Sequence, residues 1–225
     1  MWVIKVTRVY WIRHCEAMGN VERTLQGHVD TDISPLGEKQ LSFLAKRFED
    51  VSVDAVYSSP LYRAVKTARA VADGKGINVI THNGLIEMSF GILDGKPRDE
   101  SFRKYPELLQ AWNYRPYDFA PPEGEAMRDT YERVWNTLTE IVKENRGKTI
   151  AIATHGGVTR CICCRLLYND IKRLADVDWT ENTGVACIEF DDALTPTLKF
   201  YNDCSHLPKE YINPKSRFVK PEDEE

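Results

Sequence analysis

The sequence predicts an α/β fold, a three-layer sandwich in which a mostly parallel central sheet carries helices on both faces. Short apolar runs alternate with stretches whose apolar residues recur every three or four positions, as expected of repeated strands and helices. A chain of 225 residues can bury roughly 70% of its unfolded surface, which is enough for one sizeable core. We therefore expect a single domain over residues 1–208 and a polar C-terminal tail over residues 209–225.

Six segments have the composition of β-strands, because they are short, apolar and rich in β-branched or aromatic residues. They cover residues 9–12, 53–57, 77–81, 149–154, 185–190 and 197–201. Asp191 and Asp192 lie between the last two segments, which we expect to form a hairpin. The earlier strands are separated by helical segments, so we expect them to pair in parallel.

Four segments have helical periodicity. They cover residues 35–48, 60–73, 129–144 and 158–167. Ser34 and Pro35 are the residue types of an N-cap and a first helical position, and Pro60 suits the start of the second helix. Gly74 and Gly76 follow that helix and are typical of its end.

The charge and the apolar pattern exclude several partners and locations. The net charge of −4 and the isoelectric point near 5.8 argue against nucleic acid or an anionic membrane as the main partner. Residues 1–8 mix basic and apolar side chains without the apolar core of a signal peptide, and no apolar run has the length of a membrane span. We expect a cytoplasmic protein, with a homodimer as the default oligomeric state.

The cysteines lack the spacing of a disulfide framework, so we expect reduced thiols. They are Cys15, Cys161, Cys163, Cys164, Cys187 and Cys204. Three of them fall inside the helix predicted over residues 158–167, where positions two and three apart cannot all face one ion. We therefore expect no metal site and interpret these thiols as small buried side chains.

Three of the predicted strands lead to residues that carry chemistry. Arg13 and His14 follow the first strand, Arg63 stands soon after the second, and His155 directly follows the fourth. The carboxyl ends of parallel strands meet at one edge of a sheet, where α/β proteins bind ligands. His14 is a potential nucleophile beside the fixed positive charge of Arg13. This combination suits attack on the phosphorus of an anionic ester, because the cation offsets the negative charge.

Together these motifs resemble those of the histidine phosphatase superfamily, which comprises phosphoglycerate mutase-like enzymes and their phosphatase relatives. The matching residues follow the order and spacing of that family and cover most of the chain. They are Arg13, His14 and Glu16 with Asn20, then Gln26-Gly27, Ser34-Pro35-Leu36-Gly37, Ser58-Ser59-Pro60 with Arg63, Glu87 with Gly91 and Gly95, and His155-Gly156. Cys15 departs from the pattern, since the family usually has Gly there. The resemblance implies the phosphoglycerate mutase-like form of the sandwich, on the phosphatase branch.

The resemblance and the side-chain chemistry imply a phosphohistidine mechanism that needs no cofactor and no metal. His14 attacks phosphorus through one ring nitrogen, while the other donates a hydrogen bond to a backbone carbonyl. Arg13, Arg63 and His155 hold the phosphoryl oxygens, with His155 protonated or donating. Glu87 protonates the leaving group and later takes a proton from water. The neutral groups near the ester are Asn20, Gln26, Gly27 and Gly156.

The segment over residues 90–124 breaks the alternation and is predicted to be an irregular cap over the site. We interpret most of its aromatic residues as a small separate core, with a few facing the leaving group. These aromatic residues are Phe102, Tyr105, Trp112, Tyr114, Tyr117 and Phe119. The basic residues of the cap either stay solvated or reach a carboxylate or second phosphate of the substrate. They are Arg98, Arg103, Lys104 and Arg115.

Cys15 admits several interpretations. If the family has Gly at this position because the backbone adopts an angle that only Gly takes readily, Cys15 is strained. If the family has Gly there because a side chain would not fit, the thiol crowds the pocket. A thiol beside Arg13 could also have a lowered pKa and act as an oxidation-sensitive switch. An inert packed side chain is the interpretation that we favour.

Three functions compete. The first is a cofactor-independent phosphomonoesterase that hydrolyses a small phosphorylated metabolite through phosphohistidine on His14. The second is a phosphoglycerate mutase, and the third is a non-catalytic phosphate-binding protein. The short cap and the turn over residues 121–125 resemble those of the phosphatase branch, whereas mutases of the family usually carry a longer, more basic insertion. The sequence therefore favours the phosphatase.

Overall fold

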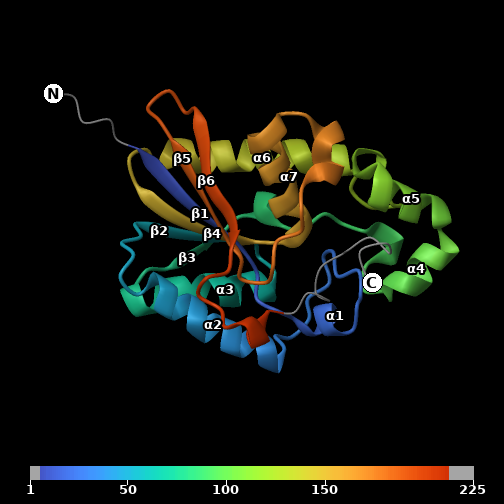
Figure 1. Ribbon diagram of the computed structural model, residues 1–225, viewed down its shortest axis with the longest axis horizontal. Helices are drawn as coiled ribbons and strands as arrows, with labels where there is room; N and C mark the ends of the chain where they lie inside the picture. The colour runs from blue at the N-terminus through green and yellow to red at the C-terminus, as the bar shows by residue number, and fades with distance from the viewer. Residues whose placement is uncertain (1–5, 213–225) are drawn as a thin grey trace.

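The computed structural model describes residues 6–212 and has a six-stranded sheet between layers of helices (Figure 1). The strands lie side by side in the order β3-β2-β4-β1-β5-β6. Their bounds are β1 (Thr7–Arg13), β2 (Ala55–Ser58), β3 (Val79–Thr81), β4 (Thr149–Thr154), β5 (Val185–Phe190) and β6 (Pro196–Asp203). The expected strands are present, and each begins and ends within two residues of its predicted bounds.

β4 lies in the parallel part of the sheet. It pairs in parallel with β1 and β2, and β2 pairs in parallel with β3. β5 runs antiparallel to both β1 and β6, so the last two strands form the predicted hairpin. Residues 150–154 of β4 are all buried, as expected of a strand covered on both faces. The prediction of a mostly parallel sheet is confirmed.

Helices cover both faces of the sheet, α2 and α3 on one and α6 and α7 on the other (Figure 1). Their bounds are α2 (Pro35–Phe48), α3 (Tyr62–Ala72), α6 (Met127–Glu144) and α7 (Gly156–Tyr168). Side chains alternate between the two faces along a strand. In β1, Trp11 accordingly packs in the cluster that contains α6 and α7 residues, whereas Ile12 packs with α2 and α3. The three-layer sandwich is confirmed.

The predicted start of α2 is confirmed, whereas the predicted start of α3 is wrong. Ser34 caps α2 as expected, since its Oγ accepts a hydrogen bond from the Gly37 amide at 2.9 Å. α3 begins at Tyr62, so the expectation that Pro60 occupies an initial helical position is wrong. The Tyr62 amide instead donates to the Asp30 carboxylate at 2.8 Å, an acceptor from a distant loop that the local sequence does not reveal.

The cap is more ordered than predicted. It contains α4 (Arg98–Lys104) and α5 (Pro106–Tyr114) instead of an irregular loop. Its aromatic side chains do not form a separate core, because Phe102, Trp112 and Phe119 belong to the same cluster as α6 and α7. Trp112 has its ring centroid 4.8 Å from that of Phe119. The interpretation as a satellite core is therefore wrong, and the cap continues the main core.

Short elements complete the chain. A four-residue helix, α1 (Met18–Val21), follows β1 and was not predicted. The 3₁₀ turns of the described residues are Asp73–Lys75, Asn83–Leu85, Gly91–Leu93, Pro116–Asp118, Ile171–Asp176 and Lys209–Tyr211. The Tyr211 carbonyl accepts from Gln40 Nε2 at 2.9 Å, so the start of the segment expected to be a tail packs on α2. Residues 213–225 of that segment lie outside the described residues.

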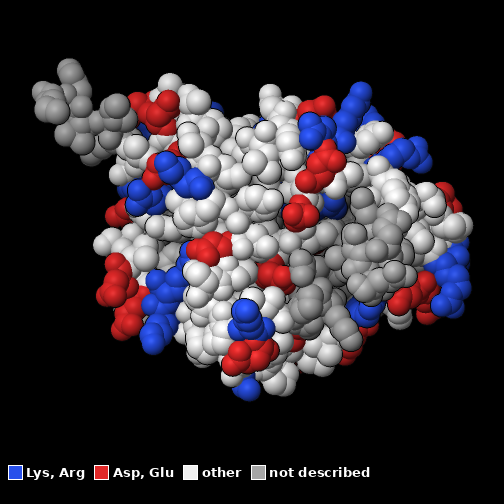
Figure 2. All heavy atoms as spheres, viewed as in Figure 1, with Lys and Arg blue, Asp and Glu red and all other residues white. Residues whose placement is uncertain are grey.

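Charges of both signs are mixed on the surface. On the face in Figure 2, the acidic and basic side chains of the described residues are interspersed, with no continuous basic area. Within residues 6–212, no helix combines the length and the apolar character required to cross a bilayer.

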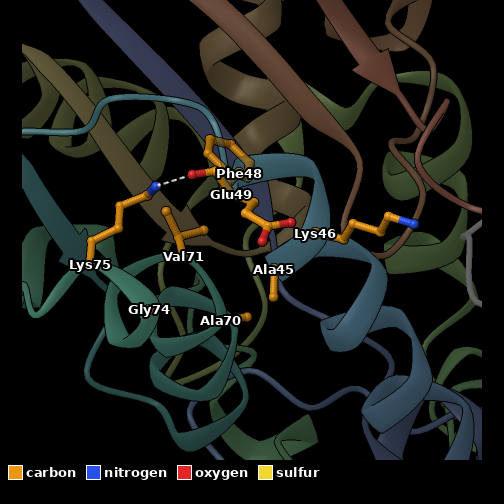
Figure 3. Close-up of a pocket in the computed structure, with 8 residues that line it drawn as sticks. All are labelled: Ala45, Lys46, Phe48, Glu49, Ala70, Val71, Gly74 and Lys75. Carbon is orange, nitrogen blue, oxygen red and sulfur yellow. Dashed lines mark hydrogen bonds between the residues drawn. The ribbon is translucent and has the colours of Figure 1, made fainter.

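A groove separate from the predicted site lies between the ends of α2 and α3 (Figure 3). It is lined by Ala45, Lys46, Phe48, Glu49, Ala70, Val71, Gly74 and Lys75. Lys75 Nζ donates to the Glu49 backbone carbonyl at 3.1 Å, which satisfies a carbonyl at the negative end of α2. A lysine that caps the last carbonyls of a helix stabilises the helix, and the groove lining contains none of the predicted site residues.

The turn before α6 offers a test of backbone strain. The Gly124 amide donates to the Pro121 carbonyl at 3.0 Å, and Glu123 between them has φ of 59°. Left-handed backbone is costly for a residue with a side chain and cheap for Gly, which turns of this kind prefer. We expect Glu123→Gly to raise the free energy of unfolding by about 1 kcal/mol, measured by denaturant unfolding. Glu123→Ala, which keeps the strain, should stay within about 0.5 kcal/mol of the wild type. A Gly variant no more stable than the Ala variant would contradict this account.

Candidate active site

The predicted site residues meet where β1, β2 and β4 end. His14 follows β1, Ser59 follows β2 and His155 follows β4. A cavity at this edge is lined by Arg13, His14, Asn20, Thr24, Gln26, Gly27, Arg63, Glu87, Phe90, Trp112, Gly156, Gly157 and Trp179. The lining includes every predicted site residue except His155, which is fully buried beside the cavity.

The sheet register brings the two histidines together. Arg13 of β1 is paired with Thr154 of β4 in a parallel ladder. The residues that follow them, His14 and His155, are therefore also side by side. Their ring centroids are 5.2 Å apart. The adjacency of the two imidazoles thus follows directly from strand pairing.

The His14 ring is held in one tautomer. Its Nδ1 lies 2.6 Å from the backbone carbonyl of Cys15. A carbonyl only accepts hydrogen bonds, so Nδ1 carries the proton and Nε2 keeps its lone pair. The expected hydrogen bond from His14 to a backbone carbonyl is present.

Burial and neighbouring cations keep His14 neutral. Only 4% of the residue is exposed. Burial lowers its pKa well below the usual 6.5, and the positive charges of Arg63 and Arg13 lower it further. Neutral imidazole is the nucleophilic form, so the surroundings hold His14 ready to react at neutral pH.

Arg63 enters the cavity from the first turn of α3. Its Nη1 donates to the Val29 carbonyl at 2.8 Å and its Nη2 to the Gly27 carbonyl at 2.9 Å, while Nε is buried without a protein acceptor. Burial lowers the pKa of Arg63 to about 10, which still leaves the guanidinium charged at neutral pH. A buried cation with an unused donor at a cavity wall is suited to an anionic ligand.

Two glycines make room for charged neighbours. Gly27 has φ of 47°, and a Cβ there would lie 1.7 Å from Asp94 Oδ1. A Cβ on Gly156 would lie 3.3 Å from Arg13 Nε. Arg13 itself is anchored by a hydrogen bond from its Nη1 to the Thr180 carbonyl. Side chains at either glycine would disturb the groups that line the cavity.

His155 is neutral in this structure. Burial, followed by the charge of Arg63, lowers its pKa well below 6.5, so its protonated form is disfavoured. Its Nε2 lies 2.7 Å from Ser59 Oγ, and that oxygen also accepts from the Leu61 amide at 3.3 Å. A hydroxyl has one proton and two lone pairs, so this contact is compatible with a proton on either ring nitrogen of His155. Nδ1 is buried without a protein partner.

Glu87 lies at the N-terminus of α7. Its Oε2 accepts from the Gly157 amide at 3.0 Å, and its Oε1 accepts from the amides of Val158 at 3.2 Å and Met88 at 3.0 Å. A carboxylate at a helix N-terminus is favoured by the helix dipole. A Cβ on Gly157 would lie 2.8 Å from Glu87 Oε1, so Gly is needed for this contact.

Asn20 and Gln26 use their oxygens within the protein. Asn20 Oδ1 accepts from the Ala17 amide at 3.0 Å, and Gln26 Oε1 accepts from the Thr31 hydroxyl at 2.9 Å. Both side chains line the cavity. With the oxygens engaged, the amide nitrogens are the ends left for a bound anion.

The family model described as histidine phosphatase superfamily (branch 1) matches residues 9–204. The chain belongs to this superfamily. It is 30% identical over 210 residues to phosphoserine phosphatase 1 of Hydrogenobacter thermophilus, and the match covers 92% of this chain and 97% of the relative. It is 33% identical over 159 residues to a 2,3-bisphosphoglycerate-dependent phosphoglycerate mutase of Allorhizobium ampelinum, and this match covers 67% of this chain and 75% of the relative. The structure of Bacillus stearothermophilus YhfR matches with a TM-score of 0.85 and 31% identity, covering 89% of this chain and 98% of that one. The phosphoglycerate mutase-like fold is confirmed.

This histidine phosphatase has cavity residues that the sequence did not indicate. Thr24, Phe90 and Trp179 line the site from outside the helices and named strands, and Gly157 lines it from the first turn of α7. Trp179 stacks on Trp112 with ring centroids 5.6 Å apart. Trp112 belongs to the cap aromatics, a few of which are expected to face the leaving group. No basic residue of the cap lines the cavity among residues 6–212.

Cys15, which replaces the usual glycine of the histidine phosphatases, is an inert packed side chain. It is 0% exposed, does not line the cavity and does not have a positive φ. Burial raises the pKa of its thiol to about 12, despite the nearby Thr67 hydroxyl. The hypotheses of backbone strain, crowding and a low-pKa redox switch are therefore wrong. The cysteines of α7 are buried and free as well.

The inertness of Cys15 can be tested by alkylation. A thiol pKa near 12 leaves about one thiolate in 10⁴ at pH 8, and burial hides the sulfur from the reagent. We expect iodoacetamide at pH 8 to leave Cys15 of the folded protein unmodified, as measured by mass spectrometry of peptides. The same protein unfolded in guanidinium chloride is the control and should react fully. Equal modification of Cys15 in both states would contradict the buried thiol.

Proposed function

We propose that this histidine phosphatase is a cofactor-independent phosphoric monoesterase that hydrolyses a small phosphorylated metabolite through phosphohistidine on His14. The observation that carries the proposal is the His14 ring at the cavity wall, with Nδ1 tied to a carbonyl and Nε2 left with a lone pair. Two buried arginines beside it supply fixed positive charge. The similarity to a phosphoserine phosphatase supports the same reaction type.

In the first step, His14 Nε2 attacks phosphorus, and the N–P bond forms as the ester O–P bond breaks. The guanidinium groups of Arg13 and Arg63 hold the equatorial oxygens and offset their charge. His155 lies beside His14 as a neutral imidazole, so of the two expected forms, protonated or donating, it acts as a neutral hydrogen-bond donor. The Gly156 amide, the one in the first turn of α7 that Glu87 does not use, adds a further donor.

Glu87 handles the protons of both steps. In its acid form it gives a proton to the departing alkoxide, and as a carboxylate it then takes a proton from the attacking water. The new O–P bond forms as the N–P bond breaks, which releases inorganic phosphate and restores neutral His14. Amides of α7 hold the carboxylate at the cavity wall between the two steps. Asn20, Gln26 and Gly27 provide neutral contacts to the ester.

The cavity favours hydrolysis over mutase chemistry. A phosphoglycerate carries a carboxylate and a bisphosphoglycerate a second phosphate, and both need cations beyond those that bind the reacting group. Arg13 and Arg63 are the basic residues that line the cavity within residues 6–212, and the remaining wall includes Phe90, Trp112 and Trp179. A non-catalytic role is disfavoured, because the nucleophile, the cations and the carboxylate are all in place.

The covalent intermediate can be trapped. We expect rapid acid-free quenching of a reaction with ³²P-labelled phosphoester to leave an acid-labile, base-stable label on His14, located by mass spectrometry. His14→Ala should lower kcat by at least about 10³-fold, because the covalent route is lost. His82→Ala is the matched control, since His82 lies outside the cavity, and it should keep wild-type activity. Activity without a label on His14 would overturn the mechanism.

The reaction class can be decided on two substrates. We expect release of inorganic phosphate from 4-nitrophenyl phosphate, and no conversion of 3-phosphoglycerate to 2-phosphoglycerate with or without 2,3-bisphosphoglycerate. Phosphate release is measured colorimetrically and isomerisation by NMR. The His14→Ala variant gives the background for both assays. Isomerisation faster than phosphate release would make the protein a mutase.

A further inference from the structure

The peptide bond between His14 and Cys15 is held on both sides by buried side chains from distant parts of the chain. Its carbonyl, on His14, accepts a hydrogen bond from Asn182 Nδ2 at 2.9 Å. Its amide, on Cys15, donates to Thr67 Oγ1 at 2.9 Å. We call Thr67 and Asn182 the peptide clamp.

Neither clamp residue lines the cavity. Thr67 is 0% exposed and Asn182 is 2% exposed. The Thr67 hydroxyl gives its own proton to the Arg63 carbonyl at 2.8 Å, one turn earlier in α3, so its oxygen is left to accept from Cys15. Each clamp residue therefore acts on the backbone and not on a ligand.

The clamped peptide precedes the carbonyl that fixes the His14 ring. His14 Nδ1 donates to the carbonyl of Cys15, the next carbonyl along the chain. That carbonyl belongs to the following peptide, whose amide on Glu16 donates to Gln40 Oε1 at 2.8 Å. With the following peptide held, rotation of the clamped peptide displaces the His14 ring relative to the carbonyl and weakens the hydrogen bond that keeps the proton on Nδ1. The proton could then occupy Nε2, where it would block the lone pair. The clamp thus bears on the tautomer of His14.

The Asn182 side of the clamp is itself braced. Thr183 has φ of 57°, an uncommon backbone conformation for a β-branched residue, and its amide donates to the Arg13 carbonyl at 3.0 Å. Thr183 Oγ1 lies 3.2 Å from His206 Nε2, and Arg47 Nη1 lies 3.1 Å from His206 Nδ1. Since arginine can only donate, His206 accepts at Nδ1 and donates from Nε2 to Thr183. This chain of bonds ties the loop to α2.

We propose that Thr67 and Asn182 are positioning residues that hold His14 in its Nδ1-protonated, nucleophilic form. They act through the backbone, and they touch neither the substrate nor the reacting atoms. The proposal rests on the proposed function of His14 as the nucleophile.

Substitutions of Thr67 test the clamp. Thr67→Val keeps the shape and removes the acceptor, whereas Thr67→Ser keeps the acceptor. With 4-nitrophenyl phosphate we expect Thr67→Val to lower kcat about 10- to 100-fold while KM changes less than about twofold, because the arginines remain. Thr67→Ser should restore kcat to within about twofold of the wild type. Thr137→Val is the matched control, because the Thr137 hydroxyl makes the same bond to a carbonyl one turn back in α6, away from the cavity.

A second readout does not depend on turnover. ¹⁵N NMR of histidine-labelled protein should show His14 as the Nδ1-protonated tautomer in the wild type and Thr67→Ser, and as a mixture of tautomers in Thr67→Val. Asn182→Ala should give the same mixture, which covers the case in which Thr67→Val fails to fold. A wild-type tautomer and kcat in the folded Thr67→Val and Asn182→Ala proteins would overturn the clamp. An inactive wild type with the Nδ1-protonated tautomer, together with the mixture of tautomers in both variants, would instead refute the proposed function and support the clamp.

Discussion

The hydrogen bond from His14 Nδ1 to the Cys15 carbonyl is the interaction on which the site depends. It decides which ring nitrogen carries the proton, and therefore which one can form a bond to phosphorus. The parallel pairing of β1 with β4 places this ring beside His155, and the helices on both faces bury it. Burial in turn removes the competing protonated form. Local geometry, sheet topology and core packing thus act together to keep the lone pair of His14 Nε2 available.

Arg63 is held in the site mainly by backbone carbonyls. Its guanidinium donates to the carbonyls of Gly27 and Val29. Carbonyls satisfy the geometry of a buried guanidinium but carry no negative charge. The carboxylate of Asp30 is 3.7 Å from Arg63 and half exposed, and the charge of Glu87 also acts on this guanidinium. Arg63 thus brings a positive charge to a cavity whose wall also carries the Glu87 side chain.

Sequence patterns predicted the fold and the strand ends that carry Arg13, His14 and His155, whereas the family resemblance predicted Glu87 and the neutral groups of the cavity. Strand composition gave the sheet, and the residues directly after β1 and β4 had to meet at one edge. The helices of the cap were missed because α4 and α5 are short and lie in a segment dominated by Pro and aromatic residues. The contact of Glu87 with the amides of α7 joins positions 70 and 71 residues apart, and no local pattern encodes it. Trp179 lies in an irregular loop, where periodicity gives no signal.

The continuity of the cap with the main core limits how the cavity can exchange its contents. Trp112 and Phe119 share one apolar cluster with α6 and α7, so swinging the cap outward would expose large aromatic rings to water. Opening the cap would therefore carry a free-energy cost that a hinged surface loop does not, because the rings that it uncovers belong to the core of the fold.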